Sequence, residues 1–264
     1  MTQTVTVREA GRAATRLALF QFQWDTPPIE RLMDRLGVPA TVGYYSVRVA
    51  PLGDVPPMVA QALMPFFPVP LVAKMVTKAR EASSAAETRE IVREELDRSA
   101  DEVFGGQDGL EELVDLAEAA ASEIDICGRP LTTAWASYEW ETTGGRLFGA
   151  ATVLREHRGE GHWFAVRQAG LTGDEVHMLS RFASGRDRSG IGHGYRPKDL
   201  DRVIPSLERK GLLVDDRPTD RGVVLLDEIE KGTDVFDRDP WSALDAGQMA
   251  RFVELAGAID LKRD

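Results

Sequence analysis

The chain has 264 residues, of which 43% are hydrophobic and 28% charged, so it is long and apolar enough for one large core or two modest ones. Its 32 lysines and arginines are outnumbered by 43 aspartates and glutamates, which gives a formal net charge of −11. This acidity argues against constitutive, nonspecific binding to nucleic acid or to an anionic membrane, and it is compatible with a local basic patch. The apolar share excludes a disordered chain.

The cysteine content and the start of the sequence point to a reduced cytoplasm. Cys127 is the single cysteine, which excludes an internal disulfide and a thiolate metal cluster. Residues 1–14 carry charged side chains where a signal peptide needs an apolar core, so we expect a cytoplasmic protein. The most apolar stretch, residues 55–76, contains five prolines. Because proline interrupts helices, we expect short buried helices there and no membrane partner.

Helical patterns fill the N-terminal two thirds of the chain. Apolar residues at helical spacing predict helices over 7–36 with a break at 25–28, and over 40–50, 77–104, 110–127, 131–155 and 162–169. The helix over 131–155 is expected to be interrupted at residues 142–145, where two threonines precede two glycines. Gly159 and Gly161 predict a loop over residues 158–161.

The C-terminal third combines helices, a loop and one strand signal. Thr172 and Glu175 have the spacing of a capping box ahead of a helix. The glycine-rich segment 184–195 predicts a loop, residues 212–214 are the best strand signal, and Thr219 caps a further helix. We therefore predict a mainly α fold. Residues 1–170 form an N-terminal helical bundle that binds a ligand, and residues 171–264 form a C-terminal winged helix with a small β-wing.

Residues 171–236 contain two short motifs that resemble those of a known family. Leu207-Glu208-Arg209-Lys210-Gly211-Leu212 would end a recognition helix, and Thr219-Asp220-Arg221-Gly222 would start a long helix. Together they resemble the winged helix of the MarR type. The resemblance implies a transcriptional regulator that binds DNA and forms a homodimer through its last helix. The apolar face of that helix consists of Leu225, Leu226, Ile229 and Phe236.

The whole chain is also similar to an actinobacterial family with the same C-terminal segment. Three runs carry this likeness: Tyr44-Tyr45-Ser46-Val47-Arg48-Val49-Ala50-Pro51-Leu52-Gly53, Leu154-Arg155-Glu156-His157-Arg158-Gly159-Glu160-Gly161-His162, and Asp239-Pro240-Trp241. Members of that family are mostly named only as helix-turn-helix proteins. This resemblance therefore implies a fold and no particular reaction.

The predicted recognition helix argues both for and against DNA as a partner. Residues 197–210 hold four basic and three acidic residues, a net charge of +1, which is weak for an element among phosphates. Pro205 is expected to kink this helix, and the stretch contains neither Asn nor Gln to read bases. We expect no tight DNA binding without an additional partner. The candidate DNA contacts are Arg186, Arg188, Arg196, Lys198, Arg202 and Arg217.

Residues 154–162 concentrate ionisable side chains. Arg155, Glu156, His157 and His162 lie in this stretch, and a guanidinium can bind a carboxylate or phenolate while an imidazole can carry a proton. Tyr44, Tyr45 and Arg48 fall within one helical turn of each other. We expect these seven residues to line a pocket for an anionic or phenolic small molecule. The opposing interpretation is a salt-bridged turn with a structural role only.

Three functions stay open at this point. The leading one is a small-molecule-binding, ligand-responsive MarR-like regulator. The second is an enzyme without an organic cofactor, in which His157 or His162 moves the proton and Arg155 holds an anionic or aromatic substrate. The third is a scaffold that does neither. The sequence contains no phosphate loop, no dinucleotide fingerprint and no His-x-x-x-His spacing, so we expect no cofactor and no metal.

Overall fold

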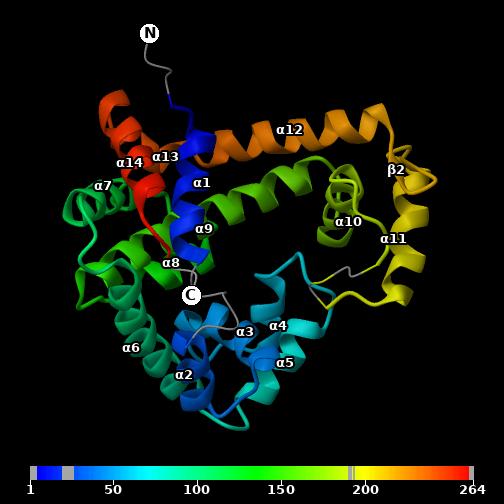
Figure 1. Ribbon diagram of the computed structural model, residues 1–264. Coiled ribbons are helices and arrows are strands. Elements are labelled where there is room, and N and C mark those ends of the chain that lie inside the picture. Colours follow the sequence, from blue (N-terminus) through cyan, green and yellow to red (C-terminus); the bar gives the residue numbers. More distant parts are fainter. Residues whose placement is uncertain (1–4, 20–26, 190–191, 193, 262–264) are drawn as a thin grey trace. The chain divides into compact units, whose positions relative to one another are not determined.

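The computed structural model describes residues 5–19, 27–189, 192 and 194–261. The chain is mainly α-helical with one small two-stranded sheet in the described part, as predicted (Figure 1). The elements, in chain order, are α1 (Val7–Ala18), α2 (Pro27–Leu36), α3 (Ala40–Val49), the 3-10 helix η2 (Ala50–Leu52), α4 (Pro57–Ala62), α5 (Leu71–Ala79), α6 (Ala85–Phe104), α7 (Leu110–Ser122), α8 (Pro130–Ala136), α9 (Thr143–Gln168), α10 (Gly173–Ala183), α11 (Pro197–Arg209), β1 (Leu213–Val214), β2 (Arg217–Pro218), α12 (Asp220–Phe236), α13 (Arg238–Trp241) and α14 (Ala246–Ala258).

The chain divides into two compact units that are interleaved in the sequence. Unit 1 comprises residues 1–55, 75–160 and 237–264, and unit 2 comprises residues 56–74 and 161–236. Helix α9 therefore contributes its first 18 residues to unit 1 and the rest to unit 2. A single cut at residue 170 stays our prediction for the domain boundary.

Local capping signals explain where several helices begin. A side-chain oxygen accepts a hydrogen bond from a backbone N–H at the open helix end, and an acid or amide three residues later bonds back to the cap. The structure contains this reciprocal arrangement at α1, α6, α10 and α14, through Thr6 and Glu9, Ser84 and Glu87, Thr172 and Glu175, and Asp245 and Gln248. The capping box predicted at Thr172 is confirmed.

The core of unit 1 is built from helices that are distant in the sequence. Its largest fully enclosed side chains include Phe104, Trp135, Phe148 and Phe252. Burying a large apolar side chain contributes roughly 1.5–3 kcal/mol, so these aromatics hold α6, α8, α9 and α14 together. Trp135 and Phe148 meet edge to face, with ring centroids 6.2 Å apart.

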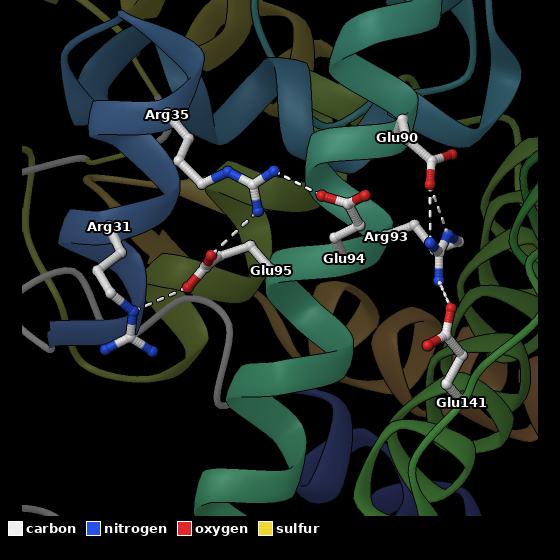
Figure 2. A network of polar contacts seen from close by, with 7 residues as sticks. All are labelled: Arg31, Arg35, Glu90, Arg93, Glu94, Glu95 and Glu141. Atoms are coloured by element: carbon white, nitrogen blue, oxygen red, sulfur yellow. Dashed lines mark hydrogen bonds and ion pairs between the residues drawn. The ribbon is translucent and has the colours of Figure 1, made fainter.

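A network of ion pairs joins α2 to α6 at the edge of this core, as Figure 2 shows. Arg31 Nε donates to Glu95 Oε1 at 2.8 Å, and Arg35 Nη1 donates to Glu95 Oε2 at 3.2 Å. Arg35 also donates to Glu94 at 2.6 Å. Glu95 is 2% exposed, so two guanidiniums balance the charge of one buried carboxylate.

The core of unit 2 is built mainly from α10 and α11. Leu179, Val203, Leu207 and Leu213 are almost completely buried within it. Strands β1 and β2 pair antiparallel, with Leu213 opposite Pro218 and Val214 opposite Arg217. We call this hairpin the wing. Its turn is made by Asp215 and Asp216, whose φ angles of 47° and 60° are left-handed.

One sequence prediction is wrong within α9. Residues 158–161 were expected to form a loop, but α9 continues unbroken from Thr143 to Gln168. Glycine permits a turn without imposing one, and the side chains on either side of Gly159 are anchored in unit 1. Arg158 donates to Asp237 at 3.1 Å, and Glu160 accepts from the backbone N–H of Leu131 at 3.0 Å.

Two further observations concern helix continuity and length. Helix α11 runs through Pro205 as one helix. Among the described residues, no helix combines the length and the apolar composition that a membrane span requires.

Candidate functional site

A cluster of charged side chains in unit 1 joins α3 to α9. Arg48 on α3 donates through Nη2 to both carboxylate oxygens of Glu156 on α9, at 3.0 and 3.1 Å. Arg155 Nη1 donates to Oε1 of the same carboxylate. We call Arg48, Arg155 and Glu156 the α9 charge cluster. Its two guanidiniums meet at one carboxylate oxygen, so two positive charges lie close together.

Burial and pairing set the electrostatics of this cluster. The side chains of Arg48, Arg155 and Glu156 are 14%, 17% and 6% exposed. Burial alone would raise the pKa of Glu156, but the two guanidinium charges lower it overall. Burial lowers the pKa of Arg155, and the neighbouring charge of Arg48 adds to that effect. The cluster therefore favours an anion at its centre.

Two tyrosines of α3 lie beside the α9 charge cluster. The phenol oxygen of Tyr44 interacts with the guanidinium of Arg48. Tyr44 and Tyr45 pack edge to face, with ring centroids 5.1 Å apart. Burial raises the pKa of the Tyr45 phenol, with Tyr44 contributing in the same direction. Aromatic surface and guanidinium charge thus occur together, which is the combination that suits a phenolate or an aromatic carboxylate.

The side chain of His157 makes a separate buried contact, with Asp237. The imidazole is completely buried, and its Nδ1 lies 3.2 Å from Oδ1 of Asp237. Asp237 also accepts a hydrogen bond from Arg158, and Arg129 donates to the backbone carbonyl of His157 at 2.5 Å. Within the described residues, Nε2 of His157 has no hydrogen-bond partner. His157 therefore belongs to an internal polar contact with Asp237.

Glu160 supports the start of another helix. Its carboxylate accepts from the backbone N–H of Leu131 at 3.0 Å and of Thr132 at 3.1 Å, and from the Thr132 hydroxyl at 2.6 Å. These donors belong to the first turn of α8, where N–H groups lack helical partners. Burial raises the pKa of Glu160, with the hydrogen bonds acting in the opposite direction.

His162 belongs to unit 2. Its Nδ1 lies 2.9 Å from the hydroxyl of Thr233, whose own proton is donated to the Ile229 carbonyl at 2.8 Å. The Thr233 hydroxyl oxygen can therefore accept a hydrogen bond from Nδ1–H of His162. The ring of Phe66 lies 5.6 Å from that of His162. The predicted grouping is thus divided: Arg48, Tyr44, Tyr45, Arg155 and Glu156 come together, while His157 and His162 each occupy another surrounding.

Helix α11 and the wing form the second candidate site, entirely within unit 2. The buried side of α11 carries Leu200, Val203, Ile204 and Leu207, which anchor the helix in the core. Its exposed side carries both basic and acidic residues, namely Lys198, Asp201, Arg202, Glu208 and Arg209. Arg186 and Arg217 are exposed as well, in the preceding loop and on β2.

Three of the predicted DNA contacts are paired with carboxylates. Arg188 forms a two-pronged pair with Asp216, with distances of 2.6 and 2.7 Å. Arg202 donates to Asp174, and Arg196 Nε lies 3.5 Å from Asp199. In the described part of the chain, no ion pair involves Arg186, Lys198 or Arg217. Sequence reasoning missed the partners Asp174 and Asp216, because pairs that are 28 residues apart leave no local spacing signal.

Comparison with protein families shows the family of the chain. A family model described as a helix-turn-helix family matches residues 8–261. The chain belongs to this helix-turn-helix family. The match spans both units, so the α9 charge cluster and α11 both lie within the matched region of this helix-turn-helix protein. Comparisons with curated proteins and with solved structures find no match.

The described residues also bear on metal binding. Across residues 5–19, 27–189, 192 and 194–261, no group of three or more His, Cys, Asp and Glu side chains is arranged to hold a metal ion. The carboxylates of the candidate sites are instead engaged with arginines or with backbone N–H groups, as described for Glu156, Glu160 and Asp216.

Proposed function

We propose that this helix-turn-helix protein is a DNA-binding regulator that responds to an anionic or phenolic small molecule. The observation that carries the first half is the family membership over residues 8–261, together with an exposed α11 next to a wing. The second half rests on the α9 charge cluster. A DNA-binding role would place the protein in the compartment that holds the DNA, which agrees with the expected cytoplasm.

The DNA contact of this proposal is made by α11 and the wing. A helix of 13 residues fits the major groove when one side is anchored in a core and the other is open to solvent. Lys198 and Arg202 lie on the open side, and Arg217 lies on the wing. Three acidic residues in the same stretch would repel the DNA phosphates. We therefore expect the protein to bind DNA weakly at physiological salt.

A binding assay with matched variants tests this contact. We expect Lys198→Ala and Arg217→Ala each to weaken binding to a labelled duplex from the upstream region of the protein's own gene. Each should also reduce the salt slope of log K by about 0.9, the value for one lost phosphate contact. Arg238→Ala is the control, because Arg238 is exposed and its substitution removes the same charge from unit 1. Equal effects of all three variants would argue for general electrostatics and against α11.

The ligand half of the proposal uses the chemistry of the α9 charge cluster. Two guanidiniums close to one another can bind a carboxylate or phenolate through charge-assisted hydrogen bonds. Tyr44 and Tyr45 supply aromatic surface on the same helix as Arg48. The bound anion would contact Arg48 and Arg155 from the side that their partial exposure leaves accessible.

Native mass spectrometry and calorimetry test the ligand. A small molecule that co-purifies with the protein should be an anion or a phenol. With 4-hydroxybenzoate and benzoate as probes, Arg48→Lys should lower the affinity, because lysine keeps the charge and loses the guanidinium fork. Arg146→Lys is the control, since Arg146 pairs with Glu118 on the surface of unit 1. Equal affinity of the wild type, Arg48→Lys and Arg146→Lys for these probes would contradict a ligand site at the α9 charge cluster.

The MarR-like homodimer stays a prediction within this proposal. The face of α12 expected to form it is packed within unit 2, where Ile229 is 2% exposed and Phe236 contacts Phe164 at 5.6 Å between ring centroids. Val223 and Val224 are instead the exposed apolar residues near the start of α12. Light scattering across a concentration series would measure the oligomeric state, and a monomer would contradict the prediction.

The enzyme alternative depends on His157 and His162, each of which is engaged within its own unit. His157 is completely buried next to Asp237, and His162 lies in unit 2 beside Thr233. Arg155, which was expected to hold the substrate anion, donates to Glu156. The contacts observed therefore favour binding over catalysis at the α9 charge cluster.

A further inference from the structure

Arg188, an exposed arginine in the loop between α10 and α11, is paired with Asp216 in the turn of the wing. Arg188 Nε donates to Asp216 Oδ2 at 2.6 Å, and Arg188 Nη2 donates to Asp216 Oδ1 at 2.7 Å. This parallel, two-bond geometry is the one in which a guanidinium also binds a phosphate group. The Arg188 side chain is 55% exposed and that of Asp216 is 34% exposed, so both are open to solvent.

The same kind of pairing occurs on α11 and at its N-cap residue, Arg196. Arg202 is paired with Asp174, and Arg196 lies within 3.5 Å of Asp199. These arginines are 68% and 59% exposed, whereas their aspartates are 16% and 19% exposed. The carboxylates are therefore the inner partners, and the guanidiniums lie toward solvent, where a phosphate would approach.

We propose that Asp216 is an internal competitor of DNA phosphate for the guanidinium of Arg188. This inference rests on the proposed DNA-binding function, and it goes further by assigning a residue that limits the affinity. While Asp216 holds Arg188, the positive charge at the wing is neutralised, and one strong phosphate contact is lost. DNA must then displace the aspartate or bind without this arginine.

The backbone of the wing provides a variant that leaves its shape intact. Asp215 and Asp216 form the two-residue turn between β1 and β2, and both have left-handed φ angles. Asparagine adopts this conformation as readily as aspartate does. Asp216→Asn should therefore keep the turn while it removes the charge that competes for Arg188. Arg188 would then be available to DNA.

The adjacent residue supplies a matched control. Asp215 is exposed, occupies the same turn, and takes part in no ion pair within the described residues. Asp215→Asn changes the net charge by the same amount at nearly the same place. A general electrostatic gain would be equal in the two variants, whereas release of Arg188 is specific to Asp216→Asn.

Fluorescence anisotropy with a labelled, mixed-sequence duplex of about 30 base pairs, roughly three helical turns, tests the inference. Titrations between about 50 and 200 mM KCl give the affinity and its salt slope. We expect Asp216→Asn to bind about tenfold more tightly than Asp215→Asn, as one additional charged hydrogen bond would provide. Its salt slope should be steeper by about 0.9, the value for one phosphate contact.

A second variant separates the competing explanations. Adding Arg188→Ala to Asp216→Asn should cancel the gain, because the released guanidinium is no longer present. Equal affinity and slope in the two asparagine variants, or a gain that persists without Arg188, would overturn the inference while DNA binding itself stands. Failure of wild-type protein and of every variant to bind the duplex, even at about 50 mM KCl, would overturn the proposed function as well.

Discussion

Glu95 is a single carboxylate that holds two arginines of another helix. It is 2% exposed and accepts hydrogen bonds from Arg31 and Arg35 of α2, so its removal leaves two guanidiniums without their inner partner (Figure 2). We expect Glu95→Ala to lower the free energy of unfolding by about 1–3 kcal/mol in urea denaturation. Glu94→Ala should cost less than about 1 kcal/mol, because Glu94 is 45% exposed. Equal costs would show that burial does not matter here.

Gly11 is a residue at which the lack of a side chain has a direct packing role. A Cβ atom at this position of α1 would lie 2.7 Å from Asp237 Oδ2 and 2.9 Å from Arg158 Cδ. Gly11→Ala should therefore disturb the contact that also holds His157 and destabilise the protein by roughly 1–3 kcal/mol.

Gly257 is the control for this prediction. It lies in α14, where an added Cβ would meet nothing within 4 Å. Gly257→Ala should stabilise the protein by about 0.5–1 kcal/mol, since alanine favours the helix. Thermal denaturation of both variants measures the two signs, and a stable Gly11→Ala protein would contradict the packing described at Asp237.

At the scale of the element, α9 carries one buried glutamate, Glu156, and one partly buried glutamate, Glu160, whose protonation affects stability in opposite directions. The folded-state pKa of Glu156 is lowered, so its contribution is present above the unfolded value of about 4.5 and is lost as the pH falls through the folded pKa. The folded-state pKa of Glu160 is raised, so its contribution is present below that unfolded value and is lost as the pH rises through the folded pKa.

Unfolding as a function of pH separates these two groups. Relative to wild type, Glu156→Gln should lose least stability in acid and most at neutral pH. Glu160→Gln should show the reverse trend, because glutamine still accepts hydrogen bonds from α8 and does not bury a charge. Urea denaturation at several pH values between about 3 and 7 measures both profiles, a range that brackets the ordinary glutamate pKa. Parallel profiles would contradict the opposite directions of the two pKa shifts.

The elements also show how far the sequence alone can lead. Capping residues and apolar spacing act over a few residues, which is why α10 begins directly after the cap predicted at Thr172. The helix predicted over 77–104 is instead divided between α5, which ends at Ala79, and α6, which begins after Ser84. Partner choice over long distances was not predictable. Arg48 pairs with Glu156, 108 residues away, and that pairing follows from the packing of α3 on α9. The predicted loop over 158–161 failed for the same reason, since distant partners hold α9 straight.

At the scale of the whole molecule, the interleaving of the units has a consequence for folding. The core of unit 2 includes Ala165 and Val166 of α9, and Phe66 packs against it. A fragment comprising residues 171–264 lacks all three side chains. We expect it to show no cooperative thermal transition, whereas the full chain does. Circular dichroism of the fragment provides the measurement, and a cooperative transition would support the boundary predicted at residue 170.

The two-aspartate turn of the wing restricts which mutations its gene can accept. Left-handed φ angles at Asp215 and Asp216 favour aspartate, asparagine and glycine over other residues. In the genetic code, an aspartate codon becomes an asparagine codon or a glycine codon by one base change. The charge of the wing can therefore be altered by a single nucleotide without loss of its shape. If the protein binds DNA as proposed, its affinity for DNA can thus change in one evolutionary step.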